Sequence, residues 1–140
     1  MTALTAPTME TRMKRWLDVG TVVLTTLLLL FAVLALRGFV APEIASARFG
    51  TAVSDPAGAL FFRVYLSRNL VIVAAGAILL LLGQWRALAI LFSLTALLPV
   101  FDMSVLLANG VTPPPLHPVA LVVLAVAALL LWRRARGRET

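Results

Sequence analysis

Two charged side chains in this sequence lie where acid–base or ligand-binding chemistry could take place inside a membrane. Arg68 precedes an apolar run, 70–82, of only 13 residues, which covers about 20 Å as a helix. A helix that crosses a hydrocarbon core of ~30 Å must therefore extend upstream and include Arg68. By the same reasoning the apolar run 87–101 must continue through Asp102. Both charges are expected inside the bilayer, where ionisable residues are rare and usually functional.

The two charges are also expected at the same depth. Arg68 lies 15 residues before Gly83 and Asp102 lies 15 residues after Ala87, which is about 22 Å along an α-helix in each case. Adjacent antiparallel helices would bring them together, and an unpaired charge at that depth costs several kcal/mol. The sequence predicts an intramembrane Arg68–Asp102 ion pair that is catalytic, with Asp102 as proton acceptor or donor and Arg68 orienting a substrate. The alternative is a pair that only fixes helix packing.

Further side chains could line a ligand pocket around this pair, in the outer half of the bundle. Tyr65 shares a helix face with Arg68, and Asn69 lies one position further along. Pro99 lacks the N–H that would bond to the carbonyl of Thr95, so we expect it to kink its helix and widen the bundle. The predicted ligand-binding residues are Arg63, Tyr65, Asn69 and His117.

Each of these ligand-binding residues also has a simpler interpretation. Arg63 could extend its side chain to the membrane surface, and Tyr65 could be an interface anchor. His117 lies beside Pro118 at the start of an apolar run, where it could be a solvated residue at the end of a loop.

Metal and cofactor chemistry is not expected. The sequence has no cysteine and one histidine, which excludes thiolate metal sites, iron–sulfur clusters and imidazole clusters. It also lacks an H-E-x-x-H motif, a glycine-rich phosphate loop and a G-x-S-x-G elbow. We therefore predict no metal site and no cofactor.

The composition excludes a soluble domain. Hydrophobic residues make up 61% of the chain and charged residues 13%, against about 45–50% and about 25% in ordinary globular domains. The net charge of +6 could suggest nucleic acid as a partner, but the basic residues flank apolar runs, as they do beside membrane spans. The expected partner is the lipid bilayer, and nucleic acid is not expected.

The apolar runs predict the fold class: an all-α integral membrane protein, built as an up-and-down bundle of four transmembrane helices in one domain, 1–140. Each run approaches the ~20 residues that a spanning helix needs. The expected helices are 17–37, 58–82, 86–108 and 116–133, with an outer loop at 38–57 and polar tails at 1–11 and 136–140.

The flanking charges predict the orientation. Most of the lysine and arginine residues beside the spans fall at the end that holds both termini, and basic flanks are retained in the cytoplasm. Trp16, Trp85 and Trp132 lie beside the same basic clusters, as an interfacial aromatic belt would. We expect an inner-membrane protein with both termini cytoplasmic. The alternative, a cleaved signal peptide ending at 45–47, is disfavoured because the apolar segment is longer than the about 7–15 residues of a signal sequence.

The pattern of the last three helices resembles a family of uncharacterised small four-helix membrane proteins in the broad DoxX-like group. The matching elements are Arg68-Asn69, Gly76, the turn 83–88 and the segment 99–102, which ends in Asp102. Asn69 stands where such families often have an acidic residue. The resemblance implies a four-helix bundle with a polar site in its outer half.

Together these features favour a pocket for a small apolar molecule such as a quinone, an isoprenoid or a sterol-like lipid. Proton-transfer chemistry of the isomerase or cyclase type would need only a positioned acid or base. A non-catalytic accessory subunit of a membrane complex is the alternative, and a transporter subunit is a weaker one. The partner would then be a second copy or another membrane protein, and the small residues at 74–77 would permit close helix contact.

Overall fold

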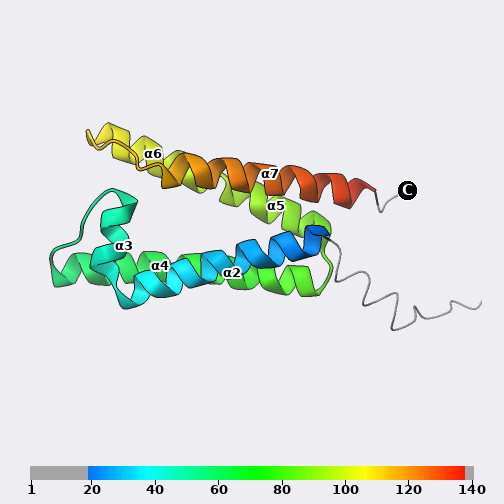
Figure 1. Cartoon of the computed structure of the whole chain (residues 1–140), viewed down its shortest axis with the longest axis horizontal. Coiled ribbons are helices and arrows are strands. Elements are labelled where there is room, and N and C mark those ends of the chain that lie inside the picture. Colours follow the sequence, from blue (N-terminus) through cyan, green and yellow to red (C-terminus); the bar gives the residue numbers. More distant parts are fainter. Residues whose placement is uncertain (1–18, 138–140) are drawn as a thin grey trace, which may run out of the picture.

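The computed structural model describes residues 19–137, and in that range it contains helices and no strand (Figure 1). The helices are α2 (Val19–Val40), α3 (Pro42–Phe49), α4 (Pro56–Leu81), α5 (Trp85–Thr95), α6 (Leu97–Ala108) and α7 (Leu116–Arg136). The predicted N-terminal tail, the start of the first helix and residues 138–140 lie outside the described residues.

Four segments are long and apolar enough to cross a membrane: Gly20–Val40, Pro56–Leu81, Trp85–Ala108 and Leu116–Arg136. They correspond to the four predicted spans, and the all-α, four-span fold class is confirmed. Large apolar side chains such as Leu29, Leu60 and Val122 remain exposed along these helices, as expected for surfaces that contact lipid. The chain is therefore a multi-pass membrane protein.

The spans form two layers that diverge (Figure 1). One layer pairs α2 with α4, and the other packs α7 against α5 and α6. The layers meet at the end that holds the α4–α5 turn, 82–84, which we call the closed end. They separate toward the end that holds α3, which we call the open end (Figure 1).

The hydrophobic core occupies the closed half, where α2, α4, α5 and α7 meet. Its largest members are Leu24, Leu28, Leu80, Trp85, Leu88, Phe92, Leu124 and Leu131. Polar contacts strengthen the same end. The Arg134 guanidinium lies 3.6 Å from the centroid of the Trp85 ring, and its Nη1 donates to Thr21 Oγ1 at 3.4 Å.

The predicted outer loop, 38–57, is mostly helical, which corrects the sequence-based expectation. α2 continues to Val40, and α3 fills most of the remainder. Pro42 begins α3, a position where its missing N–H costs nothing, and Gly50 ends it with a φ of 115°. Asp55 then caps α4 by accepting a hydrogen bond from the Gly58 amide at 2.8 Å. The segment is too short and too polar to be recognised as a helix from hydropathy alone.

The third span is broken near the proline that predicts a kink. α5 ends at Thr95 and α6 begins at Leu97, because Pro99 cannot donate a hydrogen bond to the carbonyl of Thr95. Beyond the break, α6 packs mainly against α7. The break therefore separates α6 from α4 and leaves space between the two layers.

Within the run of small residues at 74–77, Gly76 contributes to packing inside the chain. A Cβ atom at Gly76 would lie 2.8 Å from Cδ2 of Leu28, so the glycine permits the close approach of α4 to α2. We expect Gly76→Leu to lower the free energy of unfolding by about 1–3 kcal/mol through overpacking. Thermal unfolding in detergent, followed by circular dichroism, measures the effect. Ala74→Leu, at an exposed position of the same helix, should change little, and equal losses in both variants would contradict this role of Gly76.

Candidate functional site

A cavity of about 550 Å³ lies between the two layers. Every described helix contributes to its walls, and most of the lining side chains are apolar, among them Phe31, Leu34, Ile72, Leu91 and Leu98. The volume lies within the range of about 300–1,000 Å³ that is typical of small-molecule sites. The cavity is therefore large enough for a ligand with an extended apolar part.

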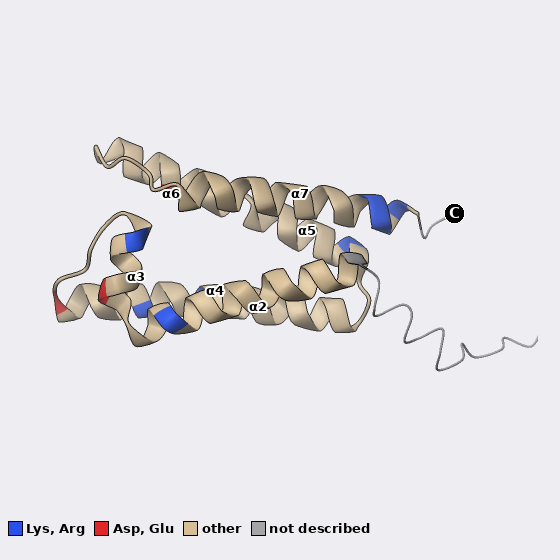
Figure 2. Cartoon of the chain, in the orientation of Figure 1, with Lys and Arg blue, Asp and Glu red and all other residues tan. Residues whose placement is uncertain are grey.

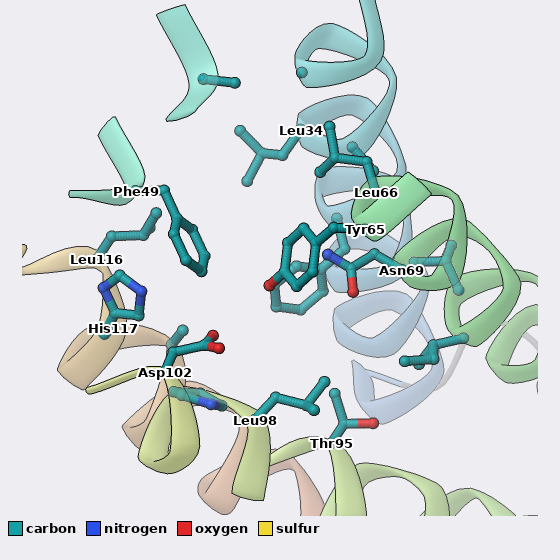
Figure 3. Close-up of a pocket in the computed structure, with 18 of the residues that line it drawn as sticks. Leu34, Phe49, Tyr65, Leu66, Asn69, Thr95, Leu98, Asp102, Leu116 and His117 are labelled. Carbon is teal, nitrogen blue, oxygen red and sulfur yellow. The ribbon is translucent and has the colours of Figure 1, made fainter. Parts of the chain in front are cut away.

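Polar side chains from three spans face this cavity (Figure 3). Tyr65 and Asn69 come from α4, Thr95 ends α5, Asp102 lies on α6 and His117 begins α7. Three of the four predicted ligand-binding residues and the predicted proton acceptor are thus gathered at one site. A few convergent polar groups in an apolar cavity are the usual composition of a site that orients a ligand.

His117 is the most deeply buried of these residues, with 3% of its surface exposed. Its Nδ1 lies 3.4 Å from the carbonyl oxygen of Pro114, and its Nε2 is buried without a hydrogen-bond partner among residues 19–137. The interpretation of His117 as a solvated loop-end residue is therefore wrong. A buried polar atom without a hydrogen-bond partner costs about 1–3 kcal/mol. A ligand that formed a hydrogen bond with this nitrogen would recover that free energy.

Asp102 and Tyr65 face each other across the cavity. The Asp102 carboxylate and the Tyr65 hydroxyl both point into the space between α4 and α6 (Figure 3). Asp102 and His117 line the same side of the cavity, and Asn69 lies beside Tyr65 on the opposite side (Figure 3). These four side chains can therefore contact one small polar group placed among them.

Phe49, at the end of α3, completes this wall of the cavity. Its ring makes edge contacts with His117 and Tyr65, at centroid distances of 4.7 and 5.5 Å, and with Phe62 at 6.3 Å. The three contacts link α3 to α7 and α4. Phe49 was not a sequence-based candidate, because the segment that carries it was predicted to be a loop.

Ser46 holds α3 in this position. Its side chain is 1% exposed; Oγ donates to the carbonyl of Glu43 at 3.1 Å and accepts from the Val53 amide at 3.0 Å. We expect Ser46→Ala to leave the Val53 amide unsatisfied, at a cost of about 1 kcal/mol, and to accelerate its hydrogen exchange several-fold in mass spectrometry. Ser54→Ala, at an exposed position, is the matched control. Unchanged exchange at Val53 in the Ser46 variant would exclude this role.

Two arginines that the sequence analysis did not select as ligand-binding residues also line the cavity: Arg37, at the end of α2, and Arg48, on α3. Both side chains are exposed, so they form a cationic rim at the open end. Only the position of α3 brings Arg48 to this cavity, and the sequence contained no signal for that position.

The predicted Arg68–Asp102 ion pair is wrong for the described part of the chain. Arg68 is exposed and does not line the cavity. On α4, Tyr65, Asn69 and Ile72 face the cavity, and Arg68 projects about 100° away from Asn69 around the helix axis. In addition, α6 packs mainly against α7, so the two charged side chains lie in different layers.

Arg63 also lies away from the cavity lining. Its Nε donates to the carbonyl of Phe39 at 3.1 Å, which fastens α4 to the end of α2. The ligand-binding assignment of Arg63 therefore has no support in the geometry, and a helix-joining contact accounts for its position. Within residues 19–137, no group of three or more histidine, cysteine, aspartate or glutamate side chains could hold a metal ion.

Comparisons with known proteins give one match. Residues 13–131 match the model of a protein family described as domain of unknown function, DUF4267. No curated protein and no solved structure matches the chain. The match supports the predicted membership of an uncharacterised protein family. It gives no support to the DoxX-like grouping.

Proposed function

The chain belongs to the DUF4267 family, and because that family is a domain of unknown function, we propose its role from the cavity: the protein binds a small apolar molecule with a polar head group, such as a quinone, an isoprenoid or a sterol-like lipid. One observation carries the proposal. His117, whose Nε2 is buried and has no hydrogen-bond partner among residues 19–137, lines a cavity of about 550 Å³. The apolar walls suit a hydrocarbon tail, and the polar side chains suit a head group.

The orientation of the cavity follows from the charges at the two ends. Arg86, Arg133, Arg134 and Arg136 lie at the closed end, where no acidic residue is found among residues 19–137 (Figure 2). The open end carries Glu43 and Asp55 beside its arginines (Figure 2). Since cytoplasmic flanks are rich in Lys and Arg, we propose that the closed end faces the cytoplasm of an inner-membrane protein. The cavity then lies in the outer half of the bilayer.

Native mass spectrometry of the protein purified in mild detergent tests the binding function. Ala120 lines the cavity one turn after His117, and Ala120→Phe would fill part of the cavity while keeping every polar side chain. We expect a discrete lipid-sized adduct on the wild-type protein and its loss from this variant. Val122→Phe, at a position exposed on the outside of the same helix, should retain the adduct.

The outcomes separate the candidate functions. An adduct that persists in Ala120→Phe would show binding outside the cavity and contradict the proposal. A wild-type chain that is bare, or bound only to another protein, would favour the non-catalytic accessory subunit. Circular dichroism must show that Ala120→Phe is folded before its mass spectrum is compared with that of the wild-type protein.

Proton transfer to or from the bound molecule is a second candidate function, favoured by the placement of Asp102 beside His117 at the same cavity. A positioned carboxylate and imidazole can act as general acid and base, as an isomerase or cyclase requires. Incubation in D₂O, followed by extraction of the ligand, would reveal deuterium at a carbon atom if such a reaction occurs. A ligand without carbon-bound deuterium would restrict the function to binding.

A further inference from the structure

We infer that the cavity selects a neutral head group that donates hydrogen bonds, an alcohol or a phenol, over a ketone, an ether, an anion or an amine. This inference rests on the proposed function, because it specifies the head group of the molecule bound there. It is carried by the hydrogen-bonding capacity of the side chains at the cavity and by the charges at its rim.

The tautomer of His117 supplies the first step. A carbonyl oxygen only accepts hydrogen bonds, so the 3.4 Å contact with Pro114 requires the proton of a neutral imidazole to be on Nδ1. Nε2 then has a free lone pair and acts as an acceptor. Because this nitrogen is buried and unpartnered among the described residues, the group that satisfies it from the cavity must be a donor.

The neighbouring side chains strengthen this preference. Asp102 offers carboxylate oxygens, to which no described residue donates a hydrogen bond. Thr95 Oγ1 already donates to the carbonyl of Leu91 at 2.8 Å, so it too offers only lone pairs to the cavity. Tyr65 and Asn69 can donate, but they lie on α4, on the opposite side of the cavity from Asp102 and His117 (Figure 3). The groups offered on the side of Asp102 and His117 are therefore acceptors, which a ketone or an ether cannot satisfy.

An ionised head group of either sign meets a like charge at this site. An anion would be placed beside the carboxylate of Asp102 and the lone pair of His117. An ammonium group would have to pass Arg37 and Arg48, which line the same cavity, and like charges oppose its entry. A neutral hydroxyl avoids both repulsions and still donates to either acceptor.

Competition binding with matched probes tests the selection. The wild-type protein is reconstituted in nanodiscs with tritiated farnesol, and unlabelled farnesol, farnesyl methyl ether and farnesylamine compete for it. The ether has the same tail and lacks the donor. We expect farnesol to compete about five- to tenfold better than the ether, and better than the amine, since one satisfied hydrogen bond changes affinity by about that factor.

A variant of His117 identifies the acceptor. His117→Phe keeps an aromatic ring against Phe49 and removes the lone pair of Nε2, so the preference for farnesol over its ether should fall about five- to tenfold. Val119→Phe, at an exposed position of α7, should keep the wild-type preference. If His117→Phe does not fold, the ranking of the three probes on the wild-type protein still decides the inference.

The inference and the proposed function fail in different ways. If farnesol and its ether compete equally and Ala120→Phe still abolishes binding, the donor preference is overturned and the cavity remains the binding site. Stronger competition by the amine would overturn it in favour of a cationic ligand. Binding of all three probes that is insensitive to Ala120→Phe, or no binding of any probe, would contradict the proposed function itself.

Discussion

Replacing Trp85 by alanine should lower the free energy of unfolding by about 3–5 kcal/mol, as truncation of a buried aromatic side chain does. Trp85 is 8% exposed and belongs to the core at the closed end. Its ring also lies 3.6 Å from the guanidinium of Arg134, which contacts Thr21 on α2. Removal of the indole therefore weakens contacts among α2, α5 and α7 at the end where the two layers meet.

Thermal unfolding in detergent, followed by circular dichroism, measures this loss. Leu94→Ala removes a large side chain from the same helix at a position that is 60% exposed, and it should leave the melting temperature nearly unchanged. An equally small effect of both substitutions would show that the open half, rather than the core at the closed end, holds the layers together.

Replacing Asp102 by asparagine should reduce the affinity for farnesol about fivefold, because a hydrogen bond to a charged acceptor is worth about 1 kcal/mol more than one to the neutral amide oxygen that replaces it. The protein should stay folded, with a melting temperature equal to or above that of the wild type in the absence of ligand. The reason is that the carboxylate has no ion-pair or hydrogen-bond partner among the described residues, and an asparagine side chain carries no charge that must be kept solvated.

Competition binding and circular dichroism on the same sample give both quantities. The two interpretations of Asp102 make opposite predictions here. A residue that fixes helix packing would lose stability on substitution, and ligand affinity would fall only because the bundle unfolds. A fall in affinity with an unchanged melting temperature is the signature of a residue that contacts the ligand.

The number of spans could be predicted from the sequence because the bilayer sets a fixed length for apolar helices. The same constraint located Asp102 inside the third span, and the missing amide of Pro99 predicted the interruption between α5 and α6. These features depend on position along one helix, which counting residues can determine.

The rotation of each helix about its axis could not be predicted in this way. Depth alone placed Arg68 opposite Asp102, but packing of α4 against α2 turns Arg68 outward and directs Tyr65 and Asn69 into the cavity. The contribution of α3 was missed for a different reason. Its place between the layers depends on contacts of Phe49 with Tyr65 and His117, which are distant in the chain, and hydropathy contains no information about such contacts.

The contact between Arg134 and Thr21 has a consequence for biosynthesis, since it joins side chains 113 residues apart at opposite ends of the described chain. The hairpin of α2 and α4 can form as soon as both have entered the membrane, because it is built from consecutive spans. The contact to α2 must wait until α7, the last span, has been synthesised and inserted. The cavity takes Tyr65 and Asn69 from the early hairpin and Asp102 and His117 from the later helices, so an assembly intermediate that lacks α7 should contain no ligand site.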